Sequence, residues 1–187
     1  MLIGGPLEFD PSILSSDPLP DLNRQMGYND DNIAWTRSGR SAISLVLDTF
    51  KKQLSKGWIL LPDYQCWSVN SVFSSVRTKN INVTAKLRLD NDTLNGHLND
   101  PEFKAVFLID YFGLSDISPE ISLIRKKRPD ILIFIDAAQS FLSLVLDKDK
   151  YLDTDAIISS PRKFLPISDG GLAIFPNKFI KFSPMPM

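Results

Sequence analysis

The sequence is poor in residues that commonly carry disulfide, metal-binding or nucleophilic chemistry. It contains one cysteine, Cys66, and one histidine, His97, among 187 residues. A single cysteine cannot form a disulfide within the chain, and one histidine in a polar segment supports neither a metal site nor a histidine-based catalytic triad. We therefore expect no metal ion and interpret His97 as a solvated side chain.

The chain also lacks a strong net charge and any long apolar segment. Its 21 Lys and Arg residues nearly balance 22 Asp and Glu residues, which gives no electrostatic reason to expect nucleic acid or a membrane surface as partner. Apolar runs such as 131–138 are far shorter than the roughly 20 residues of a membrane span, and the N-terminus does not resemble a signal peptide. These features predict a cytoplasmic protein that acts on a small molecule.

The hydrophobic residues, 43% of the chain, suffice for one substantial core. Residues 1–30 contain four prolines among serines and aspartates, a composition that interrupts helices and predicts an irregular N-terminal arm. Residues 31–187 are predicted to form a single domain.

Within that domain, segments with helical spacing alternate with short, continuous apolar runs. Helices are predicted over 38–57, 68–76 and 118–128, and residues 86–101 are predicted to be a polar connection. Because runs that are apolar along their whole length indicate strands covered on both faces, the pattern predicts a three-layer α/β/α fold with a mainly parallel sheet. In such folds, ligands bind beyond the carboxyl ends of the strands. The predicted strands are 58–61, 82–84, 105–110, 130–136, 156–158 and 171–175.

Two charged residues follow predicted strands. Asp136 directly follows the run Ile131–Ile135, at the sheet edge, where burial of a carboxylate without a partner is costly. Its alternative role is to cap a following helix. Lys163 lies between a strand and the turn Asp169-Gly170-Gly171, next to apolar residues that can lower the pKa of an amine, as Schiff-base lysines require. A solvated surface lysine is the alternative. A third candidate, Ser38-Gly39-Arg40-Ser41, begins a predicted helix whose free backbone N–H groups can bind a phosphate or be satisfied by a simple cap.

These segments together resemble the fold type I enzymes that depend on pyridoxal 5'-phosphate (PLP), in particular the DegT/DnrJ/EryC1/StrS sugar aminotransferase family. The resemblance covers about residues 30–177. It rests on motifs at 38–42, 61–66, 110–113 and 135–139 and on the lysine segment that ends in Asp169-Gly170-Gly171. It implies the large, cofactor-binding domain of a PLP-dependent transferase.

The resemblance also implies roles for individual residues. Lys163 would hold the cofactor as a Schiff base and serve as a general base. Asp136 would pair with the pyridine nitrogen of PLP. Further contacts to the cofactor would come from Gly39, Arg40, Ser41, Cys66, Trp67, Gln139, Ser159 and Ser160.

The implied activity is transfer of an amino group from a donor such as glutamate to a keto sugar nucleotide, in the synthesis of amino sugars or polysaccharides, by a homodimer. Family members continue through a small C-terminal domain, so the chain is expected to be a truncated large domain. Two alternatives stay open: an aminotransferase or a fragment of one, and a shortened, inactive homologue that binds a ligand or has a structural role.

Overall fold

One sheet of seven strands organises residues 22–177, the part of the chain that the computed structural model describes. The strands are β1 (Ile33–Thr36), β2 (Trp58–Pro62), β3 (Thr78–Ile81), β4 (Phe103–Ile109), β5 (Leu132–Asp136), β6 (Ala156–Ser159) and β7 (Gly171–Ile174). Their order across the sheet is β1-β7-β6-β5-β4-β2-β3. β7 runs antiparallel to β1 and β6, and all other neighbouring pairs are parallel. The predicted mainly parallel sheet is confirmed.

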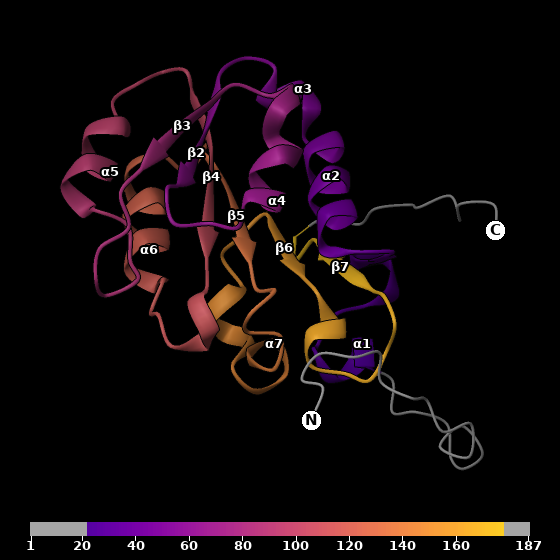
Figure 1. Ribbon diagram of the computed structural model, residues 1–187. Helices are drawn as coiled ribbons and strands as arrows, with labels where there is room; N and C mark the ends of the chain where they lie inside the picture. Colours follow the sequence, from indigo (N-terminus) through magenta and orange to yellow (C-terminus); the bar gives the residue numbers. More distant parts are fainter. Residues whose placement is uncertain (1–21, 178–187) are drawn as a thin grey trace, which may run out of the picture.

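Helices cover both faces of this sheet. They are α1 (Leu22–Gln25), α2 (Gly39–Thr49), α3 (Lys51–Leu54), α4 (Trp67–Asn70), α5 (Asn91–His97), α6 (Ser118–Lys127) and α7 (Ser143–Leu146). Short 3-10 turns are formed by Asp30–Asn32, Ser71–Ser75, Tyr111–Gly113, Lys148–Tyr151 and Pro161–Lys163. Figure 1 shows α2, α3 and α4 on one side of the sheet and α5, α6 and α7 on the other. This is the predicted three-layer α/β/α arrangement.

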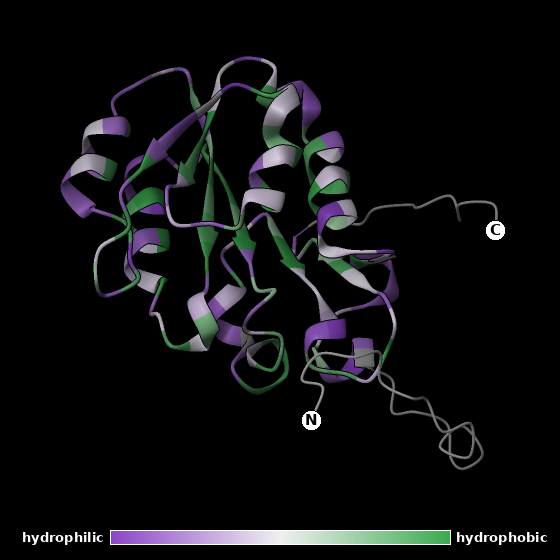
Figure 2. Ribbon diagram, in the orientation of Figure 1, coloured by the Kyte–Doolittle hydropathy of each residue, from purple (hydrophilic) through white to green (hydrophobic). Residues whose placement is uncertain are grey.

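Alternation along the strands divides the core into two layers. In β5, Phe134 points to the layer that α2 covers, whereas Ile133 and Ile135 point to the layer that α5, α6 and α7 cover. Figure 2 shows the central strands as hydrophobic and much of the outward helical surface as hydrophilic. Strands buried on both faces explain why their sequences are continuous apolar runs. No helix within residues 22–177 is long and apolar enough to cross a membrane.

Two predicted elements are placed wrongly. The segment 86–101 contains α5, because the side chain of Asp90 accepts a hydrogen bond from the N–H of Thr93 and Leu94 and Leu98 are buried. The strand expected at 82–84 is β3 at Thr78–Ile81, and Val83 forms only an isolated bridge with Leu89. The long predicted helices are also divided, into α2 and α3 and into α4 and a 3-10 turn.

The interpretation of His97 is modified, whereas the N-terminal arm stays a prediction. Residues 1–21 of the arm lie outside the described residues, and residues 22–30 include α1. His97 is half-buried, with its ring centroid 5.2 Å from that of Trp58. Burial lowers the pKa of His97 and is the largest cause of the shift. The histidine is therefore a packing residue at the end of α5.

Candidate functional site

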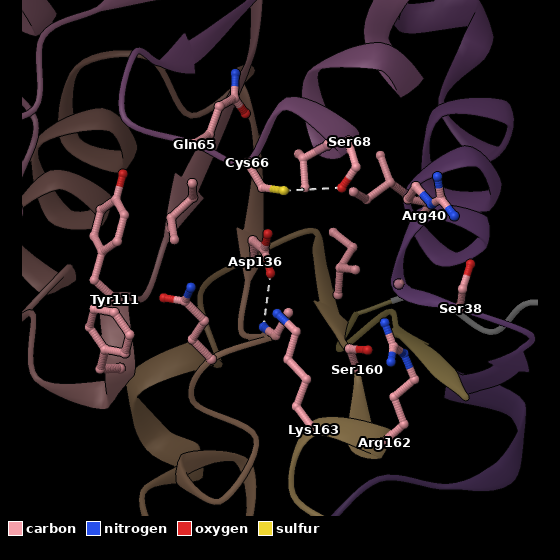
Figure 3. Close-up of a pocket in the computed structure, with 18 of the residues that line it drawn as sticks. Ser38, Arg40, Gln65, Cys66, Ser68, Tyr111, Asp136, Ser160, Arg162 and Lys163 are labelled. Atoms are coloured by element: carbon pink, nitrogen blue, oxygen red, sulfur yellow. Dashed lines mark hydrogen bonds between the residues drawn. The ribbon is translucent and has the colours of Figure 1, made fainter. Parts of the chain in front are cut away.

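A cavity of about 520 Å³ lies where β4, β5 and β6 end and α2 begins. Its walls include Ile109 from β4, Asp136 from β5, Ile158 from β6 and Gly39 from α2. Because the strands are parallel, their carboxyl ends meet at one edge of the sheet, which is where this fold class binds ligands. Figure 3 shows the polar side chains of the cavity converging from these elements.

Asp136 is the last residue of β5 and is 8% exposed. Its Oδ1 accepts a hydrogen bond of 2.8 Å from the N–H of Ala138. Burial raises the pKa of Asp136, and the Ala138 hydrogen bond and the charge of Lys163 only partly oppose this effect. The next helix, α7, begins at Ser143, so the structure does not support the helix-cap role for Asp136.

Lys163 ends the 3-10 turn that follows β6, and its side chain lines the same cavity as Asp136. The turn is held by a hydrogen bond of 3.0 Å from the N–H of Lys163 to the carbonyl oxygen of Ser160. In Figure 3 the Lys163 side chain extends toward Asp136. The amine and the carboxylate therefore face one shared space, and the lysine is exposed to it.

The beginning of α2 forms another wall. Ser38 caps the helix with extended backbone, and its hydroxyl accepts a hydrogen bond of 3.2 Å from the N–H of Ser41. A Cβ atom on Gly39 would lie 3.6 Å from the Cβ of Ser160, so the helix start lies directly against the turn that carries the lysine. A Cβ on Gly171 would lie 2.1 Å from the carbonyl carbon of Ser38, and only glycine permits this approach of β7 to the helix start.

The residues around the cavity give its two sides different chemistry. Arg40 and Arg162 lie with Ser38 and Ser160 on the side of α2 and β6. The exposed arginines and the N-terminus of an eleven-residue helix favour a negatively charged group there. Cys66 lies above Asp136 in Figure 3, with its Sγ 3.1 Å from the Ser68 hydroxyl. The hydrogen bond with Ser68 is the largest cause that lowers the pKa of this thiol.

The wall on the β4 side is aromatic. Tyr64, Tyr111 and Phe112 line it, and the rings of Tyr64 and Tyr111 are 5.6 Å apart. The Tyr111 hydroxyl donates a hydrogen bond of 2.6 Å to the carbonyl oxygen of Tyr64. Burial raises the pKa of Tyr111, so its hydroxyl stays protonated as a donor. Tyr111 lies on the opposite side of Asp136 from the arginines (Figure 3).

Most residues that the sequence predicted for the site line the cavity, but three do not. Ser41 turns its hydroxyl to Ser38 at 3.0 Å, because it belongs to the helix cap. Trp67 points outward and is 81% exposed. Ser159 is fully buried and donates to the carbonyl oxygen of Ala137 at 2.9 Å. The predicted residues that do line the cavity are Gly39, Arg40, Cys66, Asp136, Gln139, Ser160 and Lys163.

Sequence reasoning did not assign several of the lining residues to the site. They come from the loop after β2, from α4 and from the turn after β4. The signal for Gln65, Tyr111 and Phe112 was the two motifs at 61–66 and 110–113, which follow apolar runs and are therefore expected at the same sheet edge as Asp136. The residues missed in this way are Gln65, Ser68, Tyr111 and Phe112.

Comparison with known proteins identifies both a family and a fold. The family model described as Aminotransferase class-V matches residues 22–178. No curated protein matches the sequence. Solved structures are similar in fold: the NifS-like protein from Rickettsia africae has a TM-score of 0.61 and 20% identity. The histidinol-phosphate aminotransferase from Clostridium acetobutylicum has a TM-score of 0.63 and 17% identity.

A sugar aminotransferase, CalS13 from Micromonospora echinospora, is similar with a TM-score of 0.60 and 14% identity. The match with the NifS-like protein covers 89% of this chain and 46% of that structure. For the histidinol-phosphate aminotransferase the shares are 83% and 48%, and for CalS13 they are 85% and 52%. The chain thus spans about half the length of these structures. At such identities the similarity concerns the fold alone.

Proposed function

Because the chain belongs to the class-V aminotransferase family, whose members depend on PLP, we propose that it holds PLP at Lys163 and serves in the transfer of an amino group. The observation that carries this proposal is that Lys163 and the buried Asp136 line one cavity together with the start of α2. Each of these features suits a different part of the cofactor.

The residues present fit the cofactor in charge and in kind. Burial raises the pKa of Asp136, and the structure of residues 22–177 shows no ion pair to this carboxylate; a protonated pyridine nitrogen would supply one. The N-terminus of α2 and the side chains of Arg40, Arg162 and Ser160 suit the phosphate. The amine of Lys163 suits the aldehyde, with which it would form the Schiff base that holds the cofactor.

When bound, PLP supplies an electron sink for negative charge on the reacting carbon of an amino donor. The chain's own residues would control position and protons. Asp136 would keep the pyridine nitrogen protonated. Nζ of Lys163, which lines the cavity, would carry a proton to and from the donor carbon. Gln139, which also lines the cavity, would orient the ring.

The substrates belong to the same proposal. The motifs shared with the DegT/DnrJ/EryC1/StrS family, and the sugar aminotransferase among the similar structures, support glutamate as donor and a keto sugar nucleotide as acceptor. A homodimer in the cytoplasm remains the prediction that follows from the family resemblance. Sedimentation or size-exclusion measurements on the purified protein test the dimer.

Absorbance tests the cofactor site directly. Purified protein incubated with PLP should turn yellow, bleach on treatment with borohydride, and lose both responses in Lys163→Ala. Lys52→Ala is the matched control, because Lys52 is an exposed lysine on α3. A colourless wild-type protein, or a Lys163→Ala variant that behaves like the wild type, would contradict the proposal.

A second measurement separates transfer from binding alone. Addition of glutamate to the yellow protein should shift its absorbance, and a panel of keto sugar nucleotides should restore the original spectrum. Because the chain spans about half the length of its structural neighbours, the alternative is a homologue that binds the cofactor without turnover. Colour that glutamate leaves unchanged would favour that alternative.

A further inference from the structure

The turn Tyr111–Gly113, which forms part of the aromatic wall, has an unusual backbone at Phe112. Phe112 has φ 59° and ψ 11°, the left-handed region, which a bulky residue other than glycine rarely adopts. Its side chain is 57% exposed. The ring therefore contributes little burial that could offset the strained backbone, and strain of this kind is found at ligand sites where the surrounding structure imposes it.

A buried hydrogen-bond network fixes both ends of this turn. On the N-terminal side, Asp110 is fully buried and accepts hydrogen bonds from Lys150 Nζ, at 2.9 Å, and from the Tyr151 hydroxyl. On the C-terminal side, the Ser115 hydroxyl accepts from the N–H of Tyr111 at 3.1 Å, and the Ser115 carbonyl accepts from Lys150 Nζ at 2.8 Å. One lysine thus bridges the two ends of the turn.

The same network is joined to the candidate site. The N–H of Asp110 donates a hydrogen bond of 3.0 Å to the carbonyl oxygen of Asp136. The turn is therefore held at a fixed place relative to the carboxylate of the cavity. Phe112 lines the cavity and directly follows Tyr111, which lies on the opposite side of Asp136 from Arg40 and Arg162 (Figure 3).

We propose that Phe112 is a substrate-contacting residue whose ring provides a stacking face for the sugar ring of the acceptor, and that the Asp110–Lys150 network holds it there. This inference deepens the proposed function and rests on it for the identity of the reaction. A group bound over Asp136 meets cations at one end and aromatic rings at the other. A sugar ring has apolar C–H faces that pack on an aromatic ring, whereas its hydroxyl groups stay in water at the open mouth.

The experiment uses UDP-glucose and UDP as probes of the full chain, with ligand-observed saturation-transfer NMR and calorimetry. We expect saturation transfer to the glucose protons in the wild type and a weaker affinity for UDP-glucose, by about five-fold, in Phe112→Gly. The affinity for UDP alone should not change, and Phe112→Tyr should retain wild-type binding. Equal UDP-glucose affinity in the wild type and Phe112→Gly would overturn the proposal.

Thermal unfolding of the same variants separates a contact role from a structural one. Glycine adopts positive φ without strain, so Phe112→Gly should unfold at the same temperature as the wild type or above it. A lower unfolding temperature would show that the fold needs the ring and would count against the proposal. The free amino acid phenylalanine serves as a competing probe. If its affinity depends on Phe112 and the affinity of UDP-glucose does not, the sugar assignment is refuted.

PLP absorbance, measured in parallel, keeps this proposal separate from the cofactor proposal. Uptake of PLP by the wild type is the reference for this comparison, because Phe112 and Lys163 line the same cavity. A wild-type protein that does not bind PLP would overturn the proposed function. The affinities of the wild type and Phe112→Gly for UDP-glucose would still decide the role of Phe112.

Discussion

Substitution of Asp136 by asparagine should stabilise the protein without cofactor and weaken its hold on PLP. Asp136 is 8% exposed, and Ala138 provides the one hydrogen bond to its side chain that the structure shows. Asparagine is nearly isosteric and can keep this bond through its carbonyl oxygen. Because it removes a poorly compensated buried charge, we expect a gain of about 2 kcal/mol at neutral pH, or roughly 4 to 8 °C in unfolding temperature.

The gain should depend on pH with a definite sign. Burial raises the pKa of Asp136, so the folded protein binds this proton more tightly than the unfolded chain does. The wild type therefore loses stability as the pH rises from the ordinary value of about 3.9 through the raised pKa. The substituted asparagine does not titrate, so the two proteins should be nearly equal in stability below this window and differ fully above it.

Urea unfolding of both proteins across this pH range, with and without PLP, is the assay. With PLP the order should reverse, because the wild-type carboxylate gains the pyridine nitrogen as a partner and asparagine cannot hold that nitrogen protonated. For this reversal the affinity for PLP must fall by more than about 30-fold, because the loss has to exceed the gain of about 2 kcal/mol and each ten-fold change is worth 1.4 kcal/mol. The reasoning would be refuted if Asp136→Asn without PLP were less stable than the wild type at neutral pH. It would also be refuted if the difference in their free energies of unfolding did not change with pH.

Further substitutions test the packing around the site and the value of ion pairs. Gly171→Ala should cost several kcal/mol and impair PLP uptake, because a Cβ there would lie 2.1 Å from the carbonyl carbon of Ser38; unchanged urea unfolding would contradict this. Arg88→Met should cost about 3 kcal/mol in urea unfolding, since it leaves Glu120, whose side chain is 1% exposed, charged and without its partner. Arg77→Met is the control: it breaks an exposed pair and should change stability by less than about 1 kcal/mol.

The sheet and the central pair of residues could be predicted because burial leaves a clear record in sequence. The residues 131–135 before Asp136 are all apolar, as a strand covered on both faces requires. The residues 156–158, which precede the lysine turn, are also all apolar. Parallel strands bring their carboxyl ends to one edge, so two residues that follow such runs are expected to meet. Their positions in the cavity agree with this expectation.

Other elements depend on tertiary contacts that the sequence does not display. β1 has four residues and is a strand through its antiparallel pairing with β7, a partner far away in the chain. α5 contains Asn, Gly and His, poor helix formers, and rests on the Asp90 cap and on buried Leu94. The outward direction of Trp67 and the burial of Ser159 are likewise set by local backbone geometry, which residue type alone does not fix.

The contact between the start of α2 and β7 joins regions far apart in the sequence. Gly171 lies against Ser38, and the N–H of Gly170 donates a hydrogen bond of 3.0 Å to the carbonyl oxygen of Arg37. A molecule that touched both Gly39 and Lys163 would span this junction. The β7 region could then detach from α2 only after that molecule had dissociated. Amide protons of β7 would therefore exchange with solvent more slowly as the ligand concentration rises.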